Sequence, residues 1–201
     1  MSQPHDDFSN AAGKVTNDDA RLAVLDINAT ESIDDETLDT FYNRDNLLTI
    51  MMTTLNYIDE RMSHGLTLPY FEDIDLEIWQ AKLKTLDIYI TDENEGRALN
   101  LEARHKDYAT NILSYPSDLP VAIIELMPTL PLGELVICQD VMVREAEEQN
   151  KTVAQHISHL LIHGVLHLLG FDHELGQAEQ DEMEGFEIEV LASLDLPNPY
   201  I

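Results

Sequence analysis

The chain has 201 residues, enough for one domain of ordinary size, and 44% of them are hydrophobic, as in a globular protein. Its formal net charge of −28 disfavours a general nucleic-acid-binding protein, because phosphate contacts need lysine and arginine, and no DNA partner is expected. The single cysteine, Cys138, allows neither an intramolecular disulfide nor a cysteine-based zinc site, so a reducing cytoplasmic location is expected. The first 20 residues are polar and acidic and no apolar run reaches membrane-spanning length, so neither a signal peptide nor a membrane partner is expected.

The N-terminal part differs in composition from the rest of the chain. Residues 1–45 hold 11 acidic and 3 basic residues without periodic apolar groups, which predicts a mobile extension with at most a marginal helix at 18–27. A folded domain is expected over 46–201. Its apolar patterns predict strands at 47–55, 86–91, 111–116 and 133–138. They predict helices at 75–85, 92–103, 139–149, 152–169 and 177–194, and a proline-rich loop at 117–131. This order predicts an α/β (α+β) fold in which a single mixed sheet packs with about five helices.

The helix expected at 152–169 is apolar on most faces, which predicts a central, buried element. Four histidines interrupt the apolar pattern and share one stripe of the helix: His156, His159, His163 and His167. His156 and His159 are expected to be hydrogen-bonded core residues. His159 is also a candidate for supporting metal ligands from behind.

The segment HGVLHLLGFDH has the histidine spacing of the metzincin zinc proteases. His163 and His167 lie one helical turn apart, and a turn at Gly170 can return His173 to the same place. Three histidines with an open fourth position are typical of a catalytic zinc site, so one zinc ion per chain is expected, although nickel and copper accept the same ligands. Metzincins carry a glutamate base after the first histidine, whereas this chain has Gly164, which disfavours a protease.

The same segment resembles the H-G-x-L-H-L-x-G-Y-D-H signature of the YbeY family, bacterial zinc-dependent endoribonucleases of rRNA maturation. Two more segments are similar to that family, namely RHKDYATNILSYP at 104–116 and LGELVIC at 132–138. The resemblance covers roughly residues 47–201 and leaves 1–45 without a counterpart.

The resemblance implies that His163, His167 and His173 are zinc ligands. It also implies that Arg104 faces the metal cleft and serves catalysis or RNA binding. Phe171 departs from the pattern, because the family has tyrosine there, and a hydroxyl beside the site is expected to be missing. The ligand set itself is intact.

The resemblance implies a single-strand-specific, metal-dependent endoribonuclease in rRNA maturation, at the 3′ end of the small-subunit rRNA, and in ribosome quality control. The implied partners are single-stranded rRNA and a ribosomal subunit or associated ribosomal or GTPase proteins. Because the chain is so acidic, we expect weak binding of free RNA and docking on such a partner. The alternatives are a non-catalytic assembly factor that zinc stabilises and, less favoured, a zinc protease.

The chemistry of RNA hydrolysis suits the residues near the motif. A zinc ion and an arginine can both stabilise the negative charge that develops on phosphate oxygens. Residues 97–106 are locally basic, and Arg97 and Lys106 either contact RNA alongside Arg104 or are ordinary surface cations. Asp172 either orients an imidazole or caps a turn. The sequence does not identify a general base, and the attacking oxygen is either that of water or the RNA 2′-hydroxyl.

Overall fold

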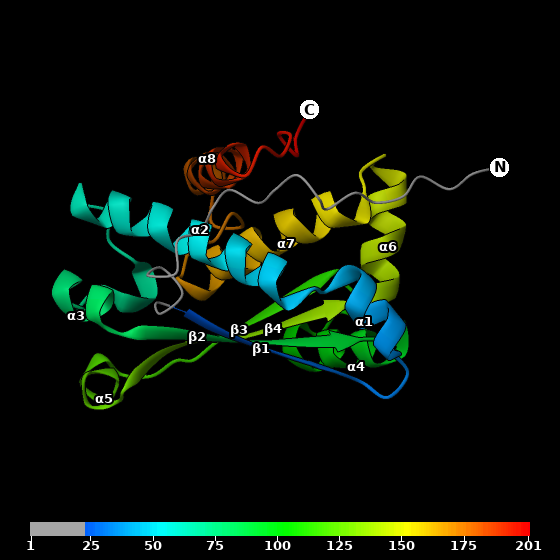
Figure 1. Cartoon of the computed structure of the whole chain (residues 1–201), viewed down its shortest axis with the longest axis horizontal. Helices are drawn as coiled ribbons and strands as arrows, with labels where there is room; N and C mark the ends of the chain where they lie inside the picture. The colour runs from blue at the N-terminus through cyan, green and yellow to red at the C-terminus, as the bar shows by residue number, and fades with distance from the viewer. Residues whose placement is uncertain (1–22) are drawn as a thin grey trace.

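The computed structural model describes residues 23–201, whose sheet is shown edge-on with its covering helices in Figure 1. The sheet has four strands in the order β1-β2-β4-β3. Their bounds are β1 Ala23–Ala29, β2 Leu83–Thr91, β3 Ile112–Pro116 and β4 Thr129–Cys138. The pairs β1–β2 and β2–β4 are parallel, whereas β3 is antiparallel to β4, which confirms the predicted single mixed sheet.

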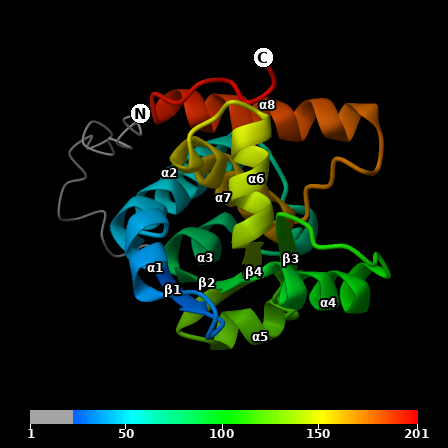
Figure 2. The ribbon, with the colours of Figure 1, turned by 90° about the vertical axis from the view of Figure 1, so that its right-hand side faces the viewer.

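Residues 23–201 contain eight α-helices and one short 3-10 helix, η2. Their bounds are α1 Asp35–Phe41, α2 Arg44–Ser63, η2 Pro69–Phe71, α3 Leu76–Ala81, α4 Glu93–Arg104, α5 Val121–Leu126, α6 Gln139–Glu148, α7 Val153–Leu168 and α8 Gln177–Ser193. In Figure 2, α2 and α7 lie on one side of the sheet with α8 farther out, and α5 lies on the other side. The five predicted helices all form, and α1, α2 and α5 come in addition. Within this part of the chain no helix is both long and apolar enough to cross a membrane.

The central element is α7, as its composition predicts. It begins with a capping box, in which the Thr152 side chain accepts from the backbone N–H of Gln155 and the Gln155 side chain accepts from the backbone of Thr152. It packs against α2, α6, α8, β3 and β4, so it is covered on most sides. Leu161, Val165 and Leu168 on it are fully buried. This packing fixes the helix, and with it the histidine stripe, against the sheet.

Two expectations for the N-terminal part are wrong. Residues 23–29 of the supposed extension form β1, which pairs along its length with β2, and residues 35–41 form α1. Residues 23–45 therefore belong to the folded part, while residues 1–22 lie outside the described residues. The apolar run at 47–55 is not a strand but lies inside α2, with Leu47, Met51 and Leu55 buried one turn apart.

The expected loop at 117–131 is shorter than its prolines suggest. Pro120 is the N-cap of the six-residue helix α5, a position that needs no backbone N–H from proline. The strand β4 already begins at Thr129 and includes Pro131, which pairs with Thr85 beside an irregularity in the β2–β4 register. The irregularity accommodates the missing hydrogen-bond donor of the proline.

Candidate metal centre

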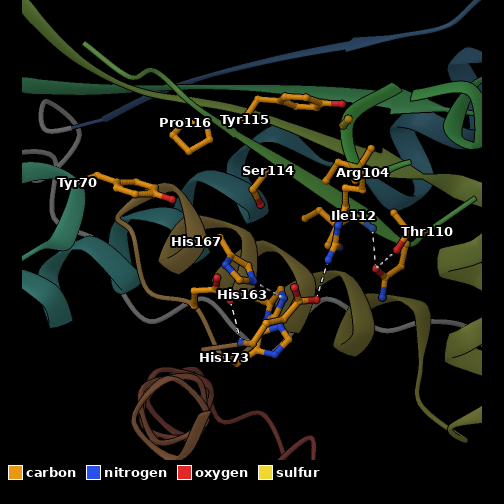
Figure 3. Close-up of a pocket in the computed structure, with 15 residues that line it drawn as sticks. Tyr70, Arg104, Thr110, Ile112, Ser114, Tyr115, Pro116, His163, His167 and His173 are labelled. Atoms are coloured by element: carbon orange, nitrogen blue, oxygen red, sulfur yellow. Dashed lines mark hydrogen bonds and ion pairs between the residues drawn. The ribbon is translucent and has the colours of Figure 1, made fainter. Parts of the chain in front are cut away.

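Three histidines from α7 and the turn after it converge on one point. His163 and His167 project from the same face of α7, and the chain reverses at Gly170, with φ of 98°, to return His173. One ligand nitrogen or more from each ring lies within 4.8 Å of the others, and the Nε2 atoms of His163 and His167 are 3.1 Å apart. Figure 3 shows the three rings clustered on one wall of a cleft. The structure therefore brings together the three side chains that the spacing selected.

A buried carboxylate holds one of these rings from behind. Glu187 on α8 is only 1% exposed, and its Oε1 accepts a hydrogen bond from His163 Nδ1 at 2.8 Å. Because the proton is on Nδ1, the lone pair of Nε2 points toward the other two histidines. The acidic neighbours of Glu187 in the sequence are typical of a solvated helix face, but the side chain of Glu187 is buried. A signal existed, since Glu187 falls in the same helical stripe as the buried Met183 and Leu191.

Two further groups bind the same carboxylate. His159 Nε2 donates to Glu187 Oε2 at 3.0 Å, and the hydroxyl of Tyr200, in the tail that runs back from α8 above α7 in Figure 1, donates to the same oxygen. Burial alone would raise the pKa of Glu187, but hydrogen bonds from His159 and His163 outweigh it and lower the pKa to about 2. His159 thus supports the carboxylate rather than a ligand directly.

The fourth histidine of the stripe is structural. His156 is buried, and its Nε2 lies 3.1 Å from Glu145 Oε2, which agrees with the expected hydrogen-bonded core residue. Phe171 is also part of the core, because its ring packs edge-on against Phe186 at 5.2 Å between centroids. Phe171 itself is not among the residues that line the cleft.

The donor set fits a divalent metal of the zinc class. Burial lowers the pKa of His167 to about 4, with His163 and His173 adding to the effect, so this ring is neutral near pH 7 and its nitrogen is free to bind a metal. Three imidazoles are borderline ligands that suit zinc and its neighbours in the first transition row. The cluster lines an open cleft of about 770 Å³, so a metal held by His163, His167 and His173 would be accessible from the cleft.

Arg104 lies across the cleft from the histidines. It ends α4, since His105 adopts a left-handed conformation with φ of 58°. The guanidinium donates to Glu174 Oε1 at 2.7 Å, which lowers the pKa of Glu174, and both side chains line the cleft. Asp172 lines it too, but its carboxylate accepts from the backbone N–H of Glu174 at 2.8 Å. Asp172 therefore caps the turn, the second of its two expected roles.

The other basic candidates do not reach the cleft. Arg97 makes a bidentate pair with Asp107, with distances of 2.7 and 2.9 Å, and neither residue lines the cavity. Lys106 does not line it either, although its charge helps to lower the pKa of Glu174. Of the three cations in the basic segment, only Arg104 faces the histidines.

Gly164 explains why the protease base is missing. This residue lies on the side of α7 that packs on β3 and β4. A Cβ at this position would come within 2.7 Å of Leu135 Cδ2 and 2.9 Å of Ile112 Cδ1. A methyl group there requires Leu135 and Ile112 to shift, and a glutamate requires a larger rearrangement, so the packing disfavours a glutamate in the position that metzincins use for their base.

Comparison with known proteins agrees with this geometry. Residues 31–195 match the family model described as Endoribonuclease YbeY. The match begins earlier than the resemblance from residue 47, because it includes α1 and α2. A Psychrobacter cryohalolentis protein named Endoribonuclease YbeY is 79% identical over 154 residues, covering 77% of this chain and 99% of that protein. An Acinetobacter baumannii protein of the same name is 45% identical over 146 residues, covering 65% of this chain and 92% of that protein.

A solution structure of a Thermotoga maritima protein is 17% identical, covers 89% of this chain and 99% of that one, and has a TM-score of 0.45. The family match spans most of the described residues, including the three histidines, Arg104 and Glu187. This chain therefore belongs to the Endoribonuclease YbeY family.

Proposed function

We propose that this protein is a single-strand-specific, metal-dependent endoribonuclease. In this proposal it acts in the cytoplasm on rRNA, at the 3′ end of the small-subunit rRNA, and in ribosome quality control. One zinc ion per chain would be held by His163, His167 and His173. The observation that carries the proposal is the convergence of these imidazoles with Arg104 in one open cleft. The family name and the relatives named Endoribonuclease YbeY support the choice of RNA as substrate.

In the proposed phosphodiester cleavage, the side chains in and behind the cleft have different roles. When bound, zinc supplies Lewis acidity for the phosphate oxygens and for the attacking oxygen. Glu187 keeps the proton of His163 on Nδ1, so that Nε2 stays available as a ligand. Arg104 contacts the phosphate from the opposite wall and stabilises the charge that develops there. It exchanges its hydrogen bond with Glu174 for one with the substrate, at low cost, since Glu174 is 57% exposed.

The strong negative charge of the chain supports a substrate RNA that is presented by a partner rather than bound free from solution. A net charge of −28 repels free RNA at long range. Among the described residues that line the cleft, Arg104 is the one arginine or lysine, and it is paired with Glu174. We propose that a ribosomal subunit, or a ribosomal or GTPase protein associated with it, presents the single-stranded rRNA. Tight, salt-insensitive binding of naked single-stranded RNA would contradict this part of the proposal.

The test combines metal content with RNA cleavage. The wild type, His167→Ala and the control His64→Ala are purified without chelator, and zinc and cleavage of single-stranded and duplex rRNA fragments are measured. His64 is exposed and hydrogen-bonds the Glu60 carbonyl, outside the cleft. We expect about one zinc per chain and single-strand cleavage in the wild type and the control, with both lost in His167→Ala.

Three results would overturn the proposal, each in a different way. Zinc retained without any cleavage would favour a zinc-stabilised assembly factor that does no chemistry. No zinc in the wild type after reloading would remove the metal centre itself. Digestion of casein by the zinc-loaded protein would instead favour a protease, which the packing at Gly164 opposes.

A further inference from the structure

A second cavity adjoins the metal cleft. It measures about 420 Å³, and three residues line both spaces: Tyr70, Tyr115 and Pro116. Figure 3 shows these three side chains following one another along the rim of the cleft that faces the histidines. The floor of the second cavity includes the buried Phe71 and Leu168. It is therefore an apolar space with aromatic walls that opens directly beside the metal centre.

Tyr70 is held in place although its ring is exposed. Its side chain is 56% exposed, whereas its neighbours Leu68 and Phe71 are buried and anchor the short helix η2. The backbone N–H of Tyr70 donates to the Leu169 carbonyl at 3.2 Å, at the end of α7. Gly170 approaches so closely that a Cβ there would lie 2.8 Å from Tyr70 N. The backbone of Tyr70 is thus held against the turn at Gly170, which also returns His173 to the cluster.

The two spaces differ in charge. Among the described residues, Asp118 is the single charged residue that lines the second cavity, and its carboxylate disfavours a phosphate there. The metal cleft also contains two carboxylates, Asp172 and Glu174, but it adds to them Arg104 and the three histidines, which offer a phosphate its partners. Phosphates and bases alternate along a single-stranded RNA, and proteins bind its unstacked bases on aromatic side chains. A phosphate in the cleft and a neighbouring base in the second cavity match this alternation.

We propose that the second cavity binds a nucleobase next to the scissile phosphate, stacked on Tyr70 and enclosed by Tyr115 and Pro116. This inference rests on the proposed function and deepens it, because it gives a reason for single-strand specificity. A base in a duplex is paired and stacked, and it enters such a cavity only after both interactions are broken. An unpaired base enters without that cost.

Tryptophan fluorescence tests the stacking directly. The native Trp79 is fully buried, so Tyr70→Trp adds the one exposed indole among the described residues. The control is Tyr108→Trp, because Tyr108 is 54% exposed and lines neither cavity. The zinc-loaded variants are titrated with a 2′-O-methyl adenosine pentanucleotide and with an abasic chain of the same length. We expect quenching of Tyr70→Trp by the base-bearing chain alone, and none in the control.

Loss of the ring gives the second readout. Tyr70→Ala should weaken binding of the base-bearing chain at least about fivefold, while Tyr70→Phe and Tyr108→Ala bind as the wild type does. Binding of the abasic chain should not change in any variant. Equal quenching by both chains, no quenching by either up to millimolar concentration, or equal affinities of Tyr70→Ala and Tyr108→Ala would overturn the stacking proposal. Neither readout needs cleavage, so stacking without cleavage would refute only the proposed function.

Discussion

Replacing Glu187 by glutamine is the sharpest test of how the metal centre is held. Three donors converge on this carboxylate: His163 Nδ1 at 2.8 Å on Oε1, and His159 Nε2 at 3.0 Å and the Tyr200 hydroxyl on Oε2. Glutamine has nearly the same shape but one acceptor oxygen. If that oxygen takes the two donors of His159 and Tyr200, an NH₂ group faces His163 Nδ1 and the imidazole proton moves to Nε2, where it opposes metal binding.

The expected loss follows from that misplaced proton. Removing a supporting carboxylate typically lowers metal affinity about 10- to 100-fold, which corresponds to roughly 1.4 to 2.8 kcal/mol. Zinc affinity is measured at pH 7 by competition with a chromophoric chelator, and circular dichroism checks the fold. The matched control is Glu189→Gln on the same helix, which removes one charge at the surface, where Glu189 pairs with Arg61 at 2.6 Å. Equal zinc affinities of the two variants would refute the role of Glu187.

Two further substitutions test the cleft and its packing. Arg104→Ala should lower kcat for RNA cleavage about 100-fold with zinc content unchanged, because a hydrogen-bond donor to the developing charge on the phosphate is lost. The control Arg97→Ala should leave kcat unchanged, since Arg97 pairs with Asp107 outside the cleft. Equal rates for the two variants would contradict the role of Arg104. Gly164→Ala should lower the free energy of unfolding by about 1–3 kcal/mol, measured by urea denaturation, because the added methyl meets Leu135 at 2.7 Å; an unchanged midpoint would show that the contact relaxes freely.

The clustering of the three histidines could be predicted from the sequence because its geometry is local. His163 and His167 belong to one helix, and only the short turn at Gly170 separates them from His173. The helix itself has strong signals, from an apolar pattern over sixteen residues to its capping box at Thr152. Where a site depends on one helix and its terminal turn, spacing and capping determine it.

The supporting residues depend on contacts that no local pattern encodes. Glu187 lies 24 positions from His163, and Tyr200 reaches the carboxylate from the tail beyond α8. Among the acidic residues of α8, only a helical-stripe argument separates Glu187 from its solvated neighbours. The same limit applies to Arg97 and Lys106, because their charge left RNA contact and an ordinary surface position equally open. In the structure Arg97 forms an ion pair with Asp107.

The errors in the secondary structure have two physical causes. The run LLTIMMTTL is apolar and partly β-branched, and over nine residues a buried helix cannot be told from a buried strand. The wider window 44–63 contains buried residues at helical spacing and resolves the question. The strand β1, AVLDINA, is apolar at five of its seven positions, but only Ala23 and Leu25 are buried, and it forms because β2 offers a parallel edge. Its formation is tertiary in origin.

Two faces of α7 matter for the site: the one that packs on the sheet at Gly164 and the one that carries the histidines. One face approaches β3 and β4 so closely that any side chain at position 164 would have to displace Leu135 and Ile112. A neighbouring face carries His163 and His167, and Glu187 on α8 hydrogen-bonds His163. This packing disfavours a glutamate, the metzincin base, directly after His163. Charge stabilisation must then come from elements across the cleft, which is where Arg104 lies at the end of α4. The close packing of α7 on the sheet thus disfavours a protease base at position 164, while the cleft contains an arginine that is able to contact a phosphate, as the proposed function requires.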